Sequence, residues 1–193
     1  MIRTTRKTFL LTTIFLVLTL LVKAQNVYNV MSYGAKGNGV ADDAAAIQKA
    51  IDKCEQNGGG IVLFPSNHVF ISGPLQLKSN VELHLETTAT LKANPDESIY
   101  KISAFGKNEG EGMLWIWAKN ADNISITGKG CIHGNGISFM GKELGDSYEL
   151  KPVTNFDPRP HVLSLTDVRN LTIKDFTIRE GAYWTVHLVG CDG

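Results

Sequence analysis

Short alternations of apolar and polar positions fill most of the chain beyond residue 60. The period of two is typical of β-strands, and small or polar residues separate one run from the next. The runs lie at 26–31, 61–64, 69–71, 75–77, 81–85, 114–117, 124–127, 163–165, 171–173, 176–178 and 186–188. The pattern therefore predicts a chain built mainly from short strands.

One helix is predicted near the start of this pattern. Its apolar positions recur at i, i+3, i+4 and i+7, which places them on one face: Ile47, Ala50, Ile51 and Cys54. The stripe predicts a helix over about 44–54, and the glycines of 58–60 end it. Asp42 and Asp43 come directly before it, so we interpret them as helix-capping and first-turn acids rather than as a catalytic pair.

A repeat of the form Asn-apolar-polar-apolar occurs three times in the strand-rich region. It begins at Asn80, Asn123 and Asn170, with spacings of 43 and 47 residues. Such periods are typical of solenoids, and we interpret each spacing as about two turns of a coil with a turn in the low twenties.

These observations together predict an all-β fold, a right-handed parallel β-helix with an N-terminal capping helix. Only Lys174 and Asp175 separate two of the predicted strands, and no Asn-Gly or Asp-Gly turn supports an antiparallel return there. Like-directed strands would stack about 4.8 Å apart. Asparagines at Asn80, Asn123 and Asn170 suit coil corners, because asparagine tolerates left-handed backbone and its amide can bond along a column.

The first 24 residues are predicted to be a signal peptide rather than part of the fold. Arg3, Arg6 and Lys7 precede the apolar run 9–22, which is shorter than the roughly 20 residues that span a bilayer. Cleavage after Ala24 would leave the β-helix domain 25–193 secreted or periplasmic, without a membrane contact. An uncleaved membrane anchor is the alternative.

Composition excludes several classes of partner and cofactor. Residues 1–24 carry four of the 19 basic residues and no acid, so 25–193 has a formal net charge of −4. The sequence has no block of basic residues of the kind that binds nucleic acid. Because the net charge repels a polyanion, a polyanionic substrate would have to bind in a local basic cleft. The chain has three cysteines, Cys54, Cys131 and Cys191. They are too few for a scaffold held by disulfides, and their spacing is not that of zinc ligands. They are therefore either buried free thiols or a single disulfide with one thiol left over, or one of them pairs with a cysteine outside this sequence. No metal and no cofactor are expected.

Three stretches resemble glycoside hydrolase family 28, the polygalacturonases, within the pectin-lyase-like β-helix group. The first is 33–47, which reads YGAKGNGVADDAAAI. The second is 123–136, NISITGKGCIHGNG, with His133 where an Asp is usual. The third runs from Arg159-Pro160 to the Trp-Thr-Val-His of 184–187, with 180–182 in place of the usual Asn-Ser-Pro. The resemblance covers essentially all of residues 27–193.

The resemblance implies a secreted hydrolase of pectin that cleaves α-1,4-galacturonan with inversion. The family's catalytic stretches all follow the Trp-Thr-x-His region and none of them can be assigned here, so we expect no catalytic residue in this chain and no activity from it alone. Arg159, Trp184 and His187 are the candidates for substrate binding.

Several alternatives stay open at this stage. A non-enzymatic carbohydrate-binding, tailspike-like or adhesin-like β-helix module would share the opening motif. A lyase of the same fold would need calcium-binding aspartates that we do not find. Trp115 and Trp117 are expected to point away from the coil, either onto sugar or under the loop 105–112. The glycine loop 34–39 lacks the features of a phosphate cradle.

Overall fold

A computed structural model of the chain describes residues 25–105, 112–140 and 159–193. The strands are β1 (Val27–Asn29), β2 (Asn38–Asp42), β3 (Gly60–Phe64), β4 (Val69–Ser72), β5 (Leu75–Gln76), β6 (Val81–Leu85), β7 (Thr90–Ala93), β8 (Met113–Gly128), β9 (Cys131–His133), β10 (Pro160–Ile173), β11 (Thr177–Arg179) and β12 (Val186–Val189). The helices are η1 (Val30–Tyr33), α2 (Ala44–Gln56), η2 (Glu97–Ile99) and η3 (Gly136–Phe139).

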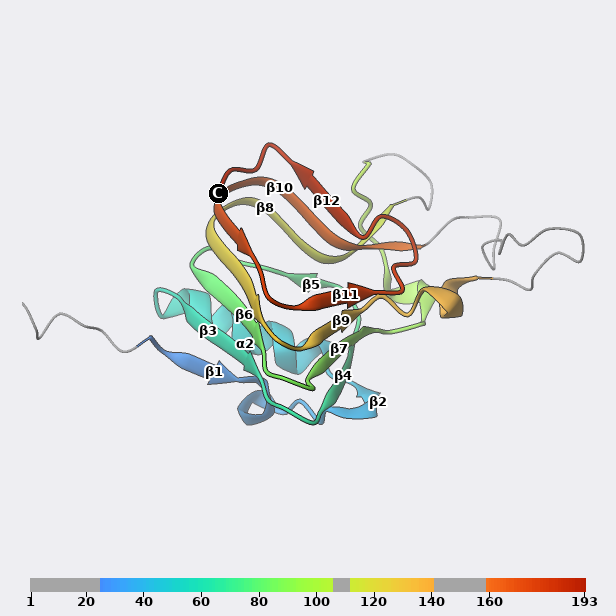
Figure 1. The fold of residues 1–193 in the computed structure, drawn as a ribbon, viewed down its shortest axis with the longest axis horizontal. Helices are drawn as coiled ribbons and strands as arrows, with labels where there is room; N and C mark the ends of the chain where they lie inside the picture. Colours follow the sequence, from blue (N-terminus) through green and yellow to red (C-terminus); the bar gives the residue numbers. More distant parts are fainter. Residues whose placement is uncertain (1–24, 106–111, 141–158) are drawn as a thin grey trace, which may run out of the picture.

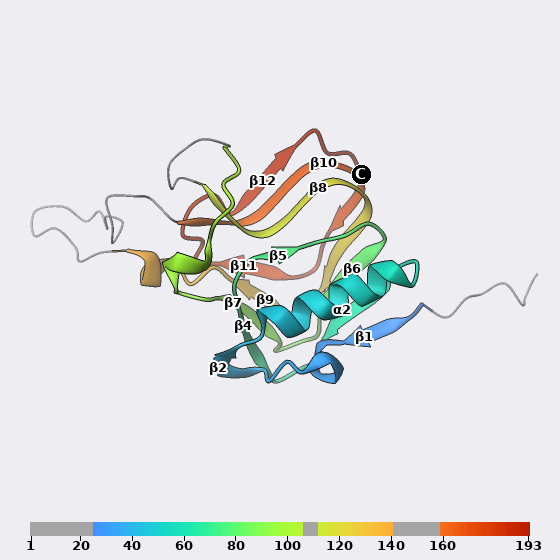
Figure 2. The same cartoon turned by 180° about the vertical axis from the view of Figure 1, so that it is seen from behind.

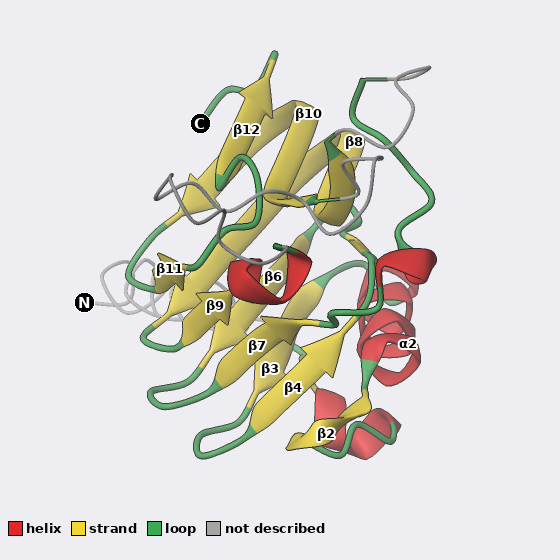
Figure 3. Ribbon diagram, turned by 90° about the vertical axis from the view of Figure 1, so that its right-hand side faces the viewer, coloured by secondary structure: helices red, strands yellow, loops and turns green. Residues whose placement is uncertain are grey.

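The named strands pair in parallel and stack into two sheets (Figures 1 and 3). One sheet has the order β1-β3-β6-β8-β10-β12, with β5 also on β8, and the other has the order β11-β9-β7-β4-β2. The long strands β8 and β10 bend around a corner, so their first and second halves lie on different faces of the coil. The chain is a right-handed parallel β-helix, and the predicted fold class is confirmed.

The repeat of 43 and 47 residues is one rung of the coil, not two. Glu82 pairs with Ser125, and Ser125 pairs with Thr172 on the next strand. The two-turn interpretation was wrong because the connections from β7 to β8 and from β9 to β10 are long and add residues to a single rung. Where the connections are short the spacing falls to 21, as between Gly60 and Val81.

The core is built from inward side chains that line up in register from rung to rung. Val62, Leu83 and Ile126 are fully buried and lie on consecutive strands. Ile173 continues this column on β10. Each such side chain contributes about 1.5–3 kcal/mol through the apolar surface that it removes from water.

Helix α2 covers an edge of the coil (Figure 2). The four apolar residues that predicted it are all buried in the core cluster, and the helix extends to Gln56. Gln48 donates from Nε2 to the carbonyl of Gln76 at 3.0 Å and accepts from its N–H at 2.9 Å. One glutamine side chain thus satisfies both backbone groups of a β5 residue, as a neighbouring strand would.

Of the two acids before α2, Asp42 bonds to the helix start as expected, whereas Asp43 has a different role. Asp43 occupies the N-cap position, but its side chain makes no bond to the helix. Its buried carboxylate instead accepts from the N–H groups of Lys36 and Gly37, at 2.6 and 2.9 Å. The glycine loop folds back over the helix start and presents these donors, so Asp43 braces the loop. Asp42 accepts from the N–H of Ala44, the first residue of α2, at 2.8 Å and so satisfies a backbone donor at the helix start.

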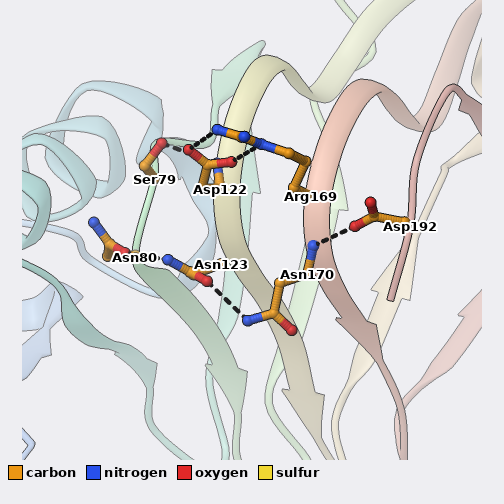
Figure 4. Close-up of polar contacts among 7 residues, drawn as sticks. All are labelled: Ser79, Asn80, Asp122, Asn123, Arg169, Asn170 and Asp192. Atoms are coloured by element: carbon orange, nitrogen blue, oxygen red, sulfur yellow. Dashed lines mark hydrogen bonds and ion pairs between the residues drawn. The ribbon is translucent and has the colours of Figure 1, made fainter.

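The repeated asparagines form a ladder along one corner (Figure 4). Asn80, Asn123 and Asn170 all have left-handed backbone, with φ of 63°, 55° and 56°. Asn123 donates to Asn80 Oδ1 at 2.7 Å, and Asn170 donates to Asn123 Oδ1 at 2.8 Å. Beside them the guanidinium of Arg169 donates two hydrogen bonds to the carboxylate of Asp122, from Nε to Oδ1 at 2.6 Å and from Nη2 to Oδ2 at 2.9 Å. Polar side chains thus join three rungs where the backbone turns.

Trp115 does not point away from the coil. It is fully buried, and its indole N–H donates to Ser72 Oγ at 3.1 Å. The alternation that led to the outward prediction fails at the start of β8, where four consecutive residues from Met113 are buried. Trp117, by contrast, is only partly buried.

All three cysteines are free thiols, with Cys54 buried and Cys131 and Cys191 half-buried. Within the described ranges, no helix is long and apolar enough to cross a membrane. The predicted signal peptide and most of the loop 105–112 lie outside the described residues.

Candidate functional site

A cluster of aromatic and imidazole rings gathers where the first half of β10 meets the start of β12. Its members come from three segments far apart in the sequence, and we call them the aromatic cluster: Phe105, His161, Tyr183, Trp184 and His187. Parallel register sets the arrangement, because Ser164 on β10 lies beside His187 on β12. The turn before β12 then carries Tyr183 and Trp184 over the start of β10, where the carbonyl of Trp184 accepts from the N–H of Val162.

His161 is the centre of the aromatic cluster. Its ring stacks on Tyr183 and on Trp184, with centroids 5.3 and 5.2 Å away and the planes inclined by 27° in both cases. Phe105 and His187 meet it edge-on at 5.4 and 5.0 Å. Ring pairs in these geometries attract one another beyond the effect of surface burial, so His161 holds the other rings in place.

Both ring nitrogens of His161 lack a hydrogen-bond partner among the described residues, although the side chain is fully buried. Burial disfavours the charged form, and the neighbouring His187 adds to this effect. Together they lower the pKa of His161 to about 4. The imidazole is therefore neutral at physiological pH and acts there as a flat, polarisable ring.

The outer part of the cluster faces solvent. Trp184 is 47% exposed, and its ring is parallel to that of Tyr183, with 1° between the planes and 5.8 Å between the centroids. The guanidinium carbon of Arg159 lies 5.0 Å from the centre of the Tyr183 ring, within range of a cation–π contact. A flat aromatic surface thus has a cation on one side of it.

His187 lies on the other side of Trp184, with ring centroids 4.9 Å apart. Its Nδ1 is 3.4 Å from Ser164 Oγ, a contact at the outer limit of a hydrogen bond. The neighbouring Val186 and Leu188 stack on the buried Leu163 and Leu165 and are about half-exposed. The side chains of Val186 and Leu188 therefore continue the inward-facing columns of the coil, and that of His187, which alternates with them, lies on its outer face.

The structure brings together the three residues named from the sequence as substrate contacts. Arg159, Trp184 and His187 all touch members of one cluster. His161 and Tyr183, which connect them, were missed. No periodic signal could have found His161, because it precedes the alternation at 163–165. Only the fold brings its ring against those of Tyr183 and Trp184.

The arrangement suits binding rather than metal chemistry. Throughout the described ranges, no group of three or more His, Cys, Asp or Glu side chains could hold a metal ion. The aromatic cluster itself contains no carboxylate. Together with Arg159 beside it, the cluster can offer an aromatic face, a guanidinium and the imidazole of His187 to a ligand.

Comparison with known proteins gives this site a context. Residues 27–127, more than half of the chain, match the family described as rhamnogalacturonase A/epimerase, pectate lyase-like. The chain belongs to this family. Polygalacturonases are among the relatives of this pectate-lyase-like protein, so the resemblance to the polygalacturonase group is confirmed.

Two curated relatives represent two kinds of activity. The exo-poly-alpha-D-galacturonosidase of Dickeya chrysanthemi is 38% identical over 121 residues, which is 57% of this chain and 20% of the relative. The plasmin and fibronectin-binding protein A of Streptococcus pneumoniae is 31% identical over 159 residues, which is 79% of this chain and 20% of the relative.

A solved structure shares the fold. The hyperthermoactive exopolygalacturonase of Thermotoga maritima matches with a TM-score of 0.70 at 24% identity, covering 87% of this chain and 45% of that one. The pectate-lyase-like chain spans a third or less of the length of the curated relatives just compared and of an apple polygalacturonase.

Proposed function

We propose that this chain forms the opening coils of an exported polygalacturonase-type hydrolase and contributes part of its binding surface for pectin. One observation carries the proposal: the exposed ring of Trp184 lies in the same cluster as Tyr183, which the guanidinium of Arg159 covers. The family membership and the galacturonan-acting relatives support the same substrate class.

The chemistry of the cluster fits a sugar acid. The exposed indole of Trp184 offers a flat apolar face for the C–H side of a pyranose ring. Arginine presents a fork of N–H donors that matches a carboxylate, so Arg159 would bind the uronate group. The domain as a whole repels a polyanion with its net charge of −4, and the local cation supplies the attraction that the global charge does not.

Hydrolysis requires groups that this cluster does not contain. Inverting glycosidases use two carboxyl groups about 6.5–9.5 Å apart, one as acid and one as base. The aromatic cluster has none, and the family's catalytic stretches cannot be assigned in this sequence, so we expect residues 25–193 alone to bind the polysaccharide without cleaving it. Export by residues 1–24 would bring the protein to the pectin of plant cell walls.

Isothermal titration of purified 25–193 with trigalacturonate tests the binding step. Arg159→Ala and Trp184→Ala should each weaken binding about tenfold or more, as expected for a lost charge-assisted hydrogen bond or a lost stacking surface. Arg179→Ala, which removes an exposed arginine on β11 in the other sheet, should leave the affinity unchanged. Equal affinity in all four proteins would refute the role of the cluster.

A reducing-end assay on polygalacturonate tests the catalytic part of the proposal. Residues 25–193 should release no new ends. Release by this chain would show that it carries catalytic groups of its own, in contradiction to the proposal.

A non-enzymatic adhesin is the second candidate, and one finding favours it. The pneumococcal relative that binds plasmin and fibronectin matches 79% of this chain at 31% identity. An adhesin would bind a host protein and would show no affinity for trigalacturonate. Saturable binding of trigalacturonate that depends on Trp184 favours the hydrolase.

A further inference from the structure

A second concave surface lies on a different face of the coil from the aromatic cluster. It crosses β6, the second half of β8 and the end of β10, where the outward residues are polar, and it encloses a volume of about 800 Å³. The left-handed residues Asp167 and Asn170 separate this part of β10 from the part that carries His161. The two surfaces therefore share a strand but not a face.

The groove is elongated rather than round. A neighbouring concavity of about 590 Å³ runs toward the asparagine corner, and the two share Glu82 and Ser125 in their walls. Ligand sites in proteins commonly measure about 300–1,000 Å³ each. Two that adjoin along the coil suit a ligand that is itself a chain.

A hydrogen-bond network fixes one functional group of the groove. Thr127 Oγ1 lies 2.5 Å from Glu82 Oε1, and because an ionised carboxylate only accepts, Thr127 uses its single proton there. His84 Nδ1 lies 2.7 Å from the same hydroxyl, so Nδ1 must donate. The proton of a neutral His84 is then on Nδ1, and Nε2 is an acceptor that has no hydrogen-bond partner among the described residues.

The remaining groups of the groove supply both donors and acceptors. Lys129 and Lys174 contribute ammonium groups, and Ser125 and Thr172 contribute hydroxyls. One oxygen of Glu86 binds Ser66 through its N–H and its hydroxyl. In the described part of the chain, the lining of this groove contains no large apolar side chain, and its acids and bases are nearly balanced. Neither an apolar peptide nor a polyanion fits such a lining as well as a chain of hydroxyl groups.

We propose that this groove is a second carbohydrate-binding site, which takes a hydroxyl-rich, largely neutral oligosaccharide with His84 Nε2 as an oriented acceptor. The site is independent of the proposed galacturonan surface. It would hold a neutral glycan, or a neutral stretch of a mixed one, while the aromatic cluster binds the uronate.

Titration of the folded chain 25–193 with β-1,4-galactotetraose tests the site, with the bound residues mapped by NMR chemical-shift changes. The wild-type protein should show shifts on β6 and β8, and His84→Ala should weaken binding at least fivefold. Thr127→Val keeps the imidazole but removes the hydroxyl that orients it, and it should also weaken binding. Circular dichroism shows that each variant is folded.

Trp184→Ala distinguishes this proposal from the galacturonan surface. It should leave the affinity for galactotetraose unchanged while it lowers that for trigalacturonate. Binding of galactotetraose that depends on Trp184 and is indifferent to His84 would overturn the second site. So would the absence of saturable galactotetraose binding by the wild-type chain.

Discussion

Asn123 donates its side-chain amide to Asn80 Oδ1 across 2.7 Å, although 43 residues separate them in the sequence. Both residues have positive φ, so each turns the backbone at the corner of its own rung. The bond joins two corners that the strand pairing has already brought into register. One residue type thus satisfies a backbone requirement and a side-chain requirement at the same position.

Substitution of Asn123 should show both contributions. Asn123→Ala loses a bond to Asn80 and a bond from Asn170, and it forces an alanine into left-handed backbone, so the free energy of unfolding should fall by about 2–3 kcal/mol. Asn123→Gly loses the same bonds without the backbone strain and should cost about 1 kcal/mol less. Urea unfolding measures both values. An unchanged midpoint for the alanine variant would show that the ladder does not stabilise the coil.

Asp43 should matter more than its neighbour. Its buried carboxylate accepts from Lys36 and Gly37, and an asparagine would direct an NH₂ group at one of those donors. Asp43→Asn should therefore lower the free energy of unfolding by about 2–3 kcal/mol. Asp42→Asn is the matched control at an exposed site and should cost about 1 kcal/mol or less. Equal losses in the two variants would show that the hydrogen bonds from Lys36 and Gly37 to Asp43 do not stabilise the fold more than an exposed contact does.

His161 should make stability depend on pH. Its ordinary pKa of 6.5 falls to about 4 in the folded chain, so the unfolded chain binds the proton more readily. The contribution of neutral His161 is complete above pH 6.5 and is lost as the pH falls from 6.5 toward 4, by at most about 3 kcal/mol. His161→Phe keeps a ring in the stack and removes this dependence. Urea midpoints from pH 4 to 7 for the two proteins give the difference, and parallel curves would refute the assignment.

Trp115 and Ser72 should be energetically coupled. Trp115→Phe leaves the buried Ser72 hydroxyl without its donor, at a cost of about 1–3 kcal/mol. Ser72→Ala in the same background removes the unpaired hydroxyl, so the double variant should lose about 1 kcal/mol less than the sum of the single ones. Trp117→Phe, at a partly exposed position, should cost under about 1 kcal/mol. Strict additivity between Trp115 and Ser72 would rule out the coupling.

Local patterns predicted most of the elements. The stripe from Ile47 to Cys54 identified α2, because a buried helical face repeats every three to four residues whatever it packs against. The recurring Asn-apolar-polar-apolar motif identified three equivalent corners, because the requirement at a corner is local as well. Left-handed backbone restricts the choice of residue at that position alone.

The spacing of the rungs could not be predicted in the same way. Hydrophobic alternation marks a strand but carries no information on which strand lies beside it. The 43 residues between Asn80 and Asn123 were interpreted as two turns because one turn of such a coil was expected to take residues in the low twenties. A long connection between two strands adds residues to a rung without adding a rung.

The candidate binding residues were found in part. Arg159, Trp184 and His187 came from a resemblance, and their proximity in the fold was not visible in the sequence. His161 is defined by its contacts with the rings of Tyr183 and Trp184, which lie in the turn before the next strand of the sheet.

The sequence by itself determined most of the strands, the capping helix, the left-handed corners and the family, because each depends on residues within one turn or one motif. Only the tertiary structure decided which strands are neighbours, that Trp115 lies inside, and that Glu82, His84 and Thr127 share one groove. These relationships arise between rungs, where the register of the strands and the lengths of the connections set the distances, and no local pattern encodes them.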